Sequence, residues 1–253
     1  EDWRFVARTG DGVVAENKDG IVGTAVCWKY GHEGGSIGMV IVAPERQGQG
    51  IGRKLIELAL DKLGKATVLL HATQPGEHLC RTLGFTKLGT VNQHQGAAFH
   101  PPLVSLPPGE RLRPLGLSDT ARAIELASRA SGLDRGEVFT ELLHASDGIA
   151  LDRDGQLQGF ALFRRFGDGY VIGPVVTPES NDLSRPKALI SHWLALNTGM
   201  FVRVDTADDS GLSEWLDSLG LPLVDTIVRM VRNGPLPIDP ALREYVIANQ
   251  ALC

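Results

Sequence analysis

Apolar residues along the first part of the chain follow two periods, one typical of strands and one typical of helices. Short apolar runs bounded by turn residues predict strands, while a helical stretch carries the apolar residues Leu55, Ile56, Leu58, Leu60 and Leu63. In chain order the pattern predicts a helix end at 2–8, strands at 12–16, 21–30 and 36–42, a helix at 50–63, a strand at 66–71, a helix at 76–83 and a strand at 85–91. This order indicates a mixed α/β domain.

The rest of the chain repeats this order of elements. It predicts a strand at 111–114, a helix at 118–130 with Ser118 as its N-cap, a helix at 136–144, strands at 148–152, 158–164 and 170–176, a helix at 184–196, a strand at 201–205, a helix at 212–219 and a strand at 223–231. The repeat predicts duplication of one domain. We therefore expect domains at 1–105 and 106–253, joined by a proline-containing linker at 96–108.

Composition and charge exclude several classes of protein. The hydrophobic content of 43% is that of a folded chain, and no apolar run approaches the roughly 18–20 residues of a membrane helix. The net charge of −5 disfavours nucleic acids and anionic membranes as partners. No signal peptide opens the chain, and Cys27, Cys80 and Cys253 are too far apart for a disulfide framework, so we expect a reduced, cytoplasmic setting.

A glycine-rich loop carries the clearest chemical signal. Gly48, Gly50 and Gly52 follow a strand that ends at Val42, and a helix begins at once. Glycines let the backbone present its N–H groups to a ligand, and the helix N-terminus adds unpaired donors and a positive dipole end. Such a loop suits a pyrophosphate. The spacing is neither that of a Rossmann dinucleotide fingerprint nor that of a P-loop.

The segment from Val42 to Arg53, with Pro44 and the pattern Q-x-x-G-x-G from Gln47, resembles the acetyl-CoA motif of the GNAT N-acetyltransferase superfamily. The stretch 72–85, closing on Gly84-Phe85, resembles the second CoA-contacting helix of that family. The first half looks like a GNAT domain without its first strand and helix. The second half resembles the C-terminal domain of bacterial tandem GNAT proteins through Gly173-Pro174-Val175-Val176, Val204-Asp205 and Arg229-Met230. The fold class implied is α/β with a mixed sheet, in two tandem GNAT-like domains.

The resemblance implies one acetyl-CoA site. Its residues are Ile41, Val42, Gln47, Gly48, Gln49, Gly50, Ile51, Gly52, Arg53, Thr73 and Gly76. Thr73, at a position where the family has Asn, could bind the pantetheine or cap a helix. The second half lacks the glutamine and the glycines and has Glu179 and Asp182 in its loop, so we expect it to be degenerate.

The resemblance also implies direct transfer of the acetyl group from the thioester to an amine, with a backbone N–H near Ile41 and Val42 stabilising the carbonyl oxygen. Cys80 stands where the family commonly has a tyrosine that donates a proton to the CoA thiolate. Its thiol can serve as that acid or simply pack in the core. His71, at a strand end, is a candidate general base or a structural histidine.

Four charged residues at positions that the second domain tends to retain are candidates for binding the acceptor in a cleft between the domains: Asp134, Arg135, Asp205 and Arg229. They can bind an ammonium or a carboxylate group, or form salt bridges between the domains. The seven histidines show no metal-ligand spacing, so no metal is expected.

Three functions remain open. The first is N-acetyltransfer from acetyl-CoA to a primary amine of a small molecule. The second is acetylation of a protein or peptide, and the third is a CoA-binding sensor without catalysis, which the missing tyrosine motivates. The sequence predicts no nucleic-acid or membrane partner, and we expect a monomer or a homodimer.

Overall fold

The structure is a computed structural model that describes residues 2–252. The chain packs as two units. Unit 1 comprises Glu1–Gly89, Ile227–Pro235 and Gln250–Cys253, and unit 2 comprises Thr90–Thr226 and Leu236–Asn249. Residues 1 and 253 lie outside the described residues, and so does the prediction made for Cys253.

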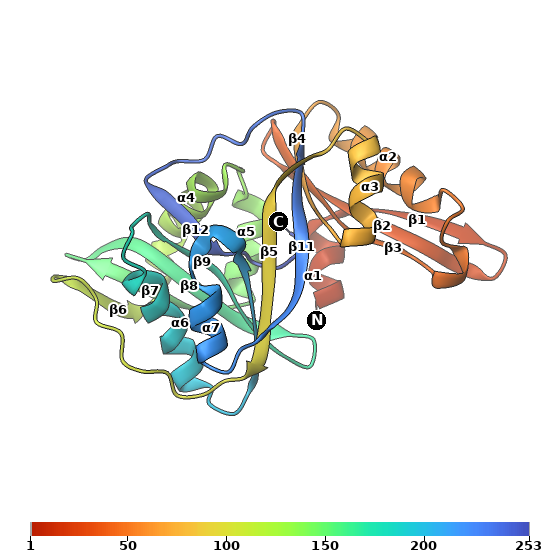
Figure 1. The fold of residues 1–253 in the computed structure, drawn as a ribbon. Helices are drawn as coiled ribbons and strands as arrows, with labels where there is room; N and C mark the ends of the chain where they lie inside the picture. Colours follow the sequence, from red (N-terminus) through yellow and green to blue (C-terminus); the bar gives the residue numbers. More distant parts are fainter. Residues whose placement is uncertain (1, 253) are drawn as a thin grey trace. The chain divides into compact units, whose positions relative to one another are not determined.

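Unit 1 is a small mixed sheet with helices packed against it. Its elements are α1 (Asp2–Thr9), β1 (Asp11–Asn17), β2 (Gly20–Tyr30), β3 (Gly34–Val42), a 3-10 turn at Pro44–Arg46, α2 (Ile51–Leu63), β4 (Thr67–Ala72) and α3 (Gln74–Thr82), with the start of β5 (Thr86–Ala97) and the end of β11 (Leu223–Arg232). The strands lie in the order β1-β2-β3-β4-β11. All neighbouring strands in this order are antiparallel except β3 and β4. Helix α2 packs on β1, β2 and β3, and α3 packs on β4 (Figure 1).

The core of unit 1 forms because the apolar face of α2 meets one face of the sheet. Ile56, Ala59, Leu60 and Leu63 lie on that helix face. They pack in one buried cluster with Val68, Leu70 and Ala72 of β4, Val228 and Met230 of β11, Cys80 and Phe85. The cluster fixes β4 and β11 side by side beneath the helices.

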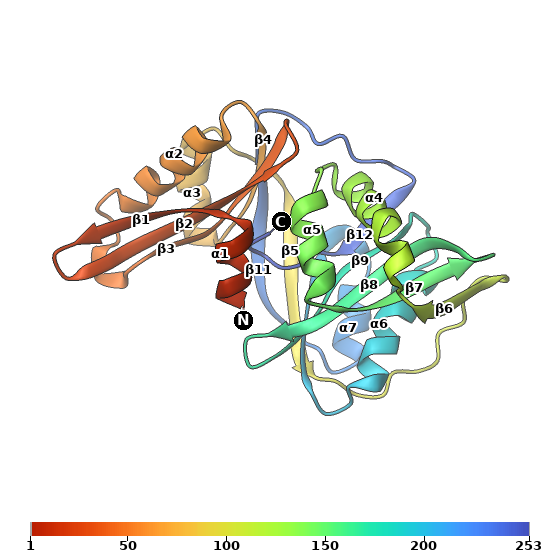
Figure 2. The ribbon, with the colours of Figure 1, turned by 180° about the vertical axis from the view of Figure 1, so that it is seen from behind.

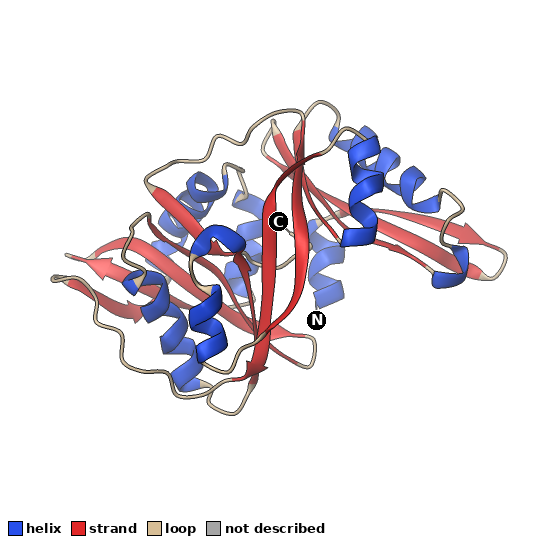
Figure 3. Cartoon of the chain, viewed as in Figure 1, coloured by secondary structure: helices blue, strands red, loops and turns tan. Residues whose placement is uncertain are grey.

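Unit 2 is a larger sheet with helices on both faces. Its elements are β6 (Glu110–Pro114), a 3-10 turn at Leu117–Asp119, α4 (Thr120–Ser131), α5 (Gly136–His144), β7 (Asp147–Arg153), β8 (Gln156–Phe166), β9 (Gly169–Pro178), α6 (Ser184–Leu196), β10 (Phe201–Ala207), a 3-10 turn at Asp208–Ser210, α7 (Ser213–Ser218) and β12 (Leu242–Val246). The strand order is β5-β10-β12-β9-β8-β7-β6. Figures 2 and 3 show α4 and α5 on one face and α6 and α7 on the other.

Aromatic stacking anchors the core of unit 2. The Phe163 ring lies between Tyr170 and Trp193, with ring centroids 4.8 Å and 5.0 Å away. Val202, Val204 and Ile172 surround this stack. The side chains at alternate positions of β10, including Asp205, therefore point to the other face of the sheet.

The predicted order of elements is confirmed, with three local corrections. Strand β5 runs to Ala97, so the segment between the halves begins later than residue 96. Strand β12 was not predicted. Ser118 is not the N-cap of α4, because a 3-10 turn precedes that helix and Asp119 accepts the Gly116 N–H at 2.8 Å.

The last strand of each half contributes to the other unit. Val228–Arg232 of β11 pair with the residues from Ala72 back to Val68 of β4. Val91–Ala97 of β5 pair with β10. The packed units therefore differ from the linear division expected between residues 105 and 106.

Helix length bears on membrane insertion. Within residues 2–252, no helix combines the length and apolar character needed to cross a bilayer.

Candidate functional site

Strands β3 and β4 pair over only part of their length. Gly34–Ile37 run parallel to Thr67–Leu70, and then the strands part. Among residues 2–252, the part of β3 from Gly38 to Val42 pairs with β2 alone. A bulge opposite Thr24 and Val26, with Met39 at a φ of 53°, turns the strand at this point. We call the gap between 38–42 of β3 and 71–72 of β4 the β3–β4 opening.

One edge of β3 is free in this opening. The Ala43 N–H donates to Val22 O at 2.9 Å. Antiparallel pairs alternate in hydrogen bonding, so the amide of Ile41 points toward β2 and that of Val42 toward the opening. Gln47 Nε2 donates to Val42 O at 3.1 Å. Of the two expected backbone donors, Val42 is therefore the one placed to meet a ligand.

The free edge leads directly into the glycine loop. Gly48 and Gly50 have φ values of 76° and 80°, and a Cβ on either would meet nothing within 4 Å. The backbone needs glycine for its conformation there, and the space before it is open. Gly50 is the N-cap of α2, whose first turn contains no acidic residue. The N–H groups of this turn are free for an anion, and the loop fits a pyrophosphate.

The other loop residues lie around this cradle. Gln49 is exposed, Ile51 and Gly52 are half-buried, and Arg53 is exposed. Arg53 donates to Thr82 Oγ1 at 2.7 Å and lies 3.9 Å from Glu57. Its guanidinium bridges α2 and α3 beside the loop and can turn toward a bound phosphate.

Helix α3 places the remaining cofactor candidates. Thr73 is its N-cap, but its side chain makes no capping hydrogen bond and is exposed. Thr73 therefore occupies the N-cap position through its backbone alone, and its hydroxyl is exposed beside the start of α3. Gly76 lies in the first turn, where its N–H donates to Thr73 O at 2.9 Å.

Cys80 lies on the core side of α3. It is 5% exposed and belongs to the apolar cluster of unit 1. Burial raises the pKa of its thiol to about 11. A weaker acid than an ordinary thiol is poorly suited to donate to a CoA thiolate, so these facts favour the packing role.

His71 lies on the opposite face of the sheet from Cys80. Its neighbours Leu70 and Ala72 face the helices, so alternation points His71 the other way. His71 Nδ1 lies 3.0 Å from Gln250 O. A carbonyl only accepts, so Nδ1 carries the proton and Nε2 carries the lone pair of the neutral ring. This is the tautomer of a base oriented by a second group.

Arg229 is the one acceptor candidate that the structure places with His71. The two residues are directly paired across β4 and β11, so their side chains share a face. Arg229 is half-buried, and its Nε has no hydrogen-bond partner among residues 2–252.

The other three acceptor candidates lie in unit 2. Asp134 is exposed in the loop before α5. Arg135 pairs with Glu244 at 2.9 Å, and both side chains are 4% exposed. Asp205 is fully buried, and Arg203 donates to it at 2.8 Å. Burial raises the pKa of the Asp205 carboxyl, against the opposing effect of Arg203. Both of these ion pairs join residues of unit 2.

The Arg135–Glu244 pair predicts a large stability effect. Arg135→Met leaves a buried carboxylate without its guanidinium, which typically costs about 3–5 kcal/mol. Urea unfolding of Arg135→Met, Glu244→Leu and the double variant measures this, and we expect the double variant to recover most of the loss. If Arg135→Met instead raised the acceptor KM without loss of stability, Arg135 would be a substrate-binding residue.

Unit 2 has an equivalent opening that its own chain fills. Strands β9 and β10 pair over Tyr170–Ile172 and Val202–Val204 and then part. Strand β12 enters there, pairing with β9 from Val175 to Pro178 and with Thr206 of β10. The following loop has no left-handed glycine. Its acids are engaged, Asp182 by the Ser184 N–H at 2.9 Å and Glu179 by Arg243 at 3.4 Å. The strand edge that is free in unit 1 is therefore occupied in unit 2.

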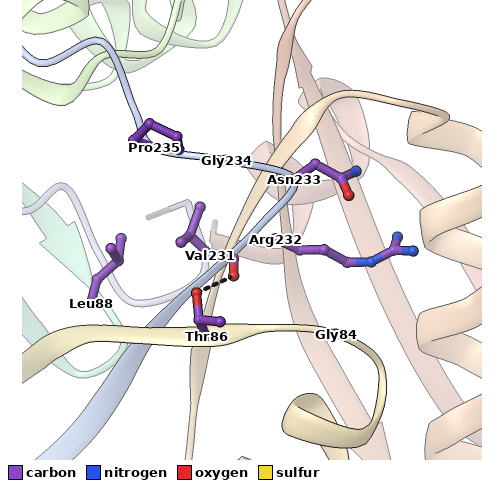
Figure 4. Close-up of a pocket in the computed structure, with 8 residues that line it drawn as sticks. All are labelled: Gly84, Thr86, Leu88, Val231, Arg232, Asn233, Gly234 and Pro235. Carbon is purple, nitrogen blue, oxygen red and sulfur yellow. Dashed lines mark hydrogen bonds between the residues drawn. The ribbon is translucent and has the colours of Figure 1, made fainter.

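Figure 4 shows a shallow pocket in unit 1, between the start of β5 and the end of β11. Thr86 Oγ1 donates to Val231 O across it at 3.3 Å, and Arg232 supplies a cation. None of the predicted site residues line it.

Metal ligands do not gather in the part of the chain that is described. Residues 2–252 contain no group of three or more His, Cys, Asp or Glu side chains placed to hold an ion. The expectation of a metal-free reaction remains a prediction.

Two family models, each described as an acetyltransferase (GNAT) domain, match residues 8–87 and 123–245. An uncharacterized N-acetyltransferase, YitH, from Bacillus subtilis is 32% identical over 58% of this chain and 52% of its own. A mycothiol acetyltransferase from Streptosporangium roseum is 38% identical over 31% of this chain and 24% of its own. The chain thus spans about half the length of the first of these relatives and about a quarter of the second.

Solved structures share the fold over nearly all of the chain. A Pyrococcus horikoshii protein classed as an acetyltransferase has a TM-score of 0.78 at 17% identity, over 100% of this chain and 84% of its own. A tandem GNAT protein from the clavulanic acid biosynthesis pathway has a TM-score of 0.58 at 17% identity, over 89% and 83%. The chain belongs to the GNAT acetyltransferase family. Within that family it is a tandem protein, with two GNAT domains in one chain.

Proposed function

We propose that unit 1 transfers an acetyl group from acetyl-CoA to a primary amine of a small molecule. The observation that carries the proposal is the free edge of β3, which continues into the Gly48–Gly50 loop at the N-terminus of α2. A strand edge can pair with the amides of a pantetheine arm, and the loop can bind the pyrophosphate at the end of that arm. Gln47, Thr73 and Arg53 surround the same path.

The reaction forms one bond and breaks another. The amine nitrogen attacks the thioester carbonyl carbon, the C–N bond forms, the C–S bond breaks and CoA leaves as the thiolate. Val42 N–H lies on the free edge of β3 next to the pyrophosphate loop, where it can pair with an amide of the pantetheine arm, and the thioester lies farther along β3, across from His71. Holding both reactants in one site adds the proximity effect.

The amine must lose a proton before or during attack. His71 Nε2 is the base in this proposal, because the Gln250 carbonyl holds the proton on Nδ1. The acceptor approaches from the face that His71 and Arg229 share. Arg229 binds an anionic group of the acceptor, since its guanidinium is half-buried beside the base.

Unit 2 has a structural role in this account, and the chain takes one acetyl-CoA. The β12 strand on the edge of β9 and the acids after Pro178 support this. The name of the mycothiol acetyltransferase relative supports a small acceptor. The buried free thiols of Cys27 and Cys80 support a cytoplasmic location.

Release of CoA thiol from acetyl-CoA tests the proposal across amino acids, polyamines and amino sugars. We expect amine-dependent release with one of these classes. The replacement of the expected tyrosine by a buried Cys80 favours a CoA-binding sensor as the second candidate. Acetyl-CoA binding without release for any amine would favour the sensor.

A further inference from the structure

Residues 247–252 pass, in each unit, the point where the two strands begin to part. We call this point the narrow end of the opening. Gly38 is the first residue of β3 beyond its last pair with β4, and Gly173 is the first residue of β9 beyond its last pair with β10. A Cβ on Gly38 would overlap the carbonyl oxygen of Ala251. A Cβ on Gly173 would overlap the carbonyl oxygen of Ile247. Both glycines therefore admit a close backbone approach.

In unit 1 this stretch is hydrogen-bonded to two strands, β4 and β2, and a residue of β3 supports the second contact. Gln250 O lies 3.0 Å from His71 Nδ1 of β4. Tyr30 of β2 donates from its hydroxyl to Leu252 O at 2.8 Å and accepts from Ser36 Oγ at 3.0 Å. Tyr30 is 1% exposed and Ser36 is fully buried. Residues 250–252 therefore cross over the narrow end of the opening on the face of the sheet away from α2 and α3, toward which His71 and a Cβ on Gly38 point.

The positions of the glycine loop and of Gly38, at opposite ends of the opening, determine the direction in which a bound CoA thioester runs. The pyrophosphate loop follows Val42 at the wide end. An arm that leaves this loop along the free edge of β3 runs toward Gly38, about 13 Å away for four strand residues. The β3–β4 pairs close this end in the plane of the sheet, so the acyl carbons beyond the thioester must turn to one face, and residues 250–252 cover the face that His71 occupies. In unit 2, strand β12 pairs along the edge of β9 beyond the narrow end. In unit 1, residues 250–252 lie at the narrow end alone, and the edge of β3 beyond it stays open.

We propose that residues 250–252 form the end wall of the acyl site and restrict the enzyme to short acyl groups. The inference rests on the proposed function, since it concerns the acyl group of the same CoA thioester. It makes Gly38 and Tyr30 determinants of specificity, because the first admits the wall and the second holds it. It also gives Gln250 a positioning role for His71 through its carbonyl oxygen.

Calorimetric titration with CoA, acetyl-CoA and hexanoyl-CoA tests the wall without relying on turnover. Gly38→Ala displaces Ala251, and Tyr30→Phe removes the hydrogen bond to Leu252. Tyr245→Phe is the matched control, because it removes a tyrosine hydroxyl that donates to a backbone carbonyl, Ser180 O, in unit 2. Thermal denaturation shows whether each variant is folded, and Tyr30→Phe serves if Gly38→Ala is not.

We expect the wild type to bind hexanoyl-CoA at least about tenfold more weakly than acetyl-CoA, since added methylenes that do not fit cost that much or more. Both wall variants should reduce this ratio by about tenfold while CoA binds as before, and Tyr245→Phe should leave it unchanged. The proposed wall would be contradicted if the wild type bound both thioesters equally well. It would also be contradicted if the ratio of acetyl-CoA to hexanoyl-CoA affinity were the same in every variant. Failure of the wild type to bind CoA at all would overturn the proposed function beneath it.

Discussion

Gly50→Leu is expected to weaken acetyl-CoA binding at least about 100-fold while the protein remains folded. Gly50 has a φ of 80°, and a side chain there would point into open space before the loop. The substitution changes the orientation of the N–H groups that meet the pyrophosphate. Its side chain also occupies the space through which the pyrophosphate reaches them. Loss of two charge-assisted hydrogen bonds, at about 1.5 kcal/mol each, corresponds to roughly this factor.

The other end of the same helix supplies the control. Gly64, the C-cap of α2, has a φ of 64°, and a Cβ there also meets nothing within 4 Å. Its ψ of −123° lies outside the left-handed helical region that Gly50 occupies, so Gly64→Leu introduces a backbone strain at least as large, about 1–3 kcal/mol, without touching the loop. Calorimetric titration of both variants separates strain from loss of the cradle. Affinities within threefold of each other would show that the loop does not hold the pyrophosphate.

His71→Gln is expected to lower kcat by about 10²–10⁴ with little change in acetyl-CoA affinity. Glutamine keeps much of the side-chain length, but it cannot accept the amine proton at neutral pH. Steady-state rates of CoA release, with the acceptor identified in the amine panel, measure the loss. Added imidazole should restore part of the rate in His71→Ala by supplying the missing base.

Two further variants serve as controls for the His71→Gln experiment. His144→Gln changes an exposed histidine at the end of α5 and should leave the rate unchanged. Cys80→Ala removes a buried thiol and should keep turnover within about threefold, because a thiol of pKa about 11 is a poor acid here. A His71→Gln rate equal to wild type would remove His71 from the chemistry, and a loss of 10²-fold in Cys80→Ala would restore Cys80 as the acid.

Local patterns in the sequence predicted the elements well. The bounds 136–144 and 184–196 are those of α5 and α6, since each helix is bounded by clear breaks in the sequence. The glycine loop was predicted for the same reason, because positive φ and an open approach demand glycine at Gly48 and Gly50 whatever the rest of the chain does.

Partners distant in sequence were not predictable in this way. The pattern showed a strand at 223–231 but could not show that Val228–Arg232 pair with β4. Asp119, not Ser118, is the N-cap of α4, and the Arg113 side chain that donates to it at 2.6 Å also donates to Asp152 of β7, which lies far along the chain. Strand β12 is short and follows a proline-containing loop, so its pattern carries little information.

The wall residues were missed for a related reason. Nothing near Gly38 shows why it must be glycine, since the atom it accommodates belongs to Ala251. The repeat itself contained a signal, because Ile37-Gly38 and Ile172-Gly173 occupy the same place in the two halves. Comparing the halves residue by residue would have singled out both glycines.

The most direct test of the account is amine-dependent release of CoA from acetyl-CoA by wild type and Gly50→Leu in one assay. The account predicts turnover with one class of small amine, well above hydrolysis without amine, and its loss in Gly50→Leu at acetyl-CoA concentrations that saturate the wild type. Undiminished turnover in Gly50→Leu would place the reaction elsewhere in the chain. Tight binding of acetyl-CoA with no release for any amine class would contradict the assignment as a small-molecule acetyltransferase.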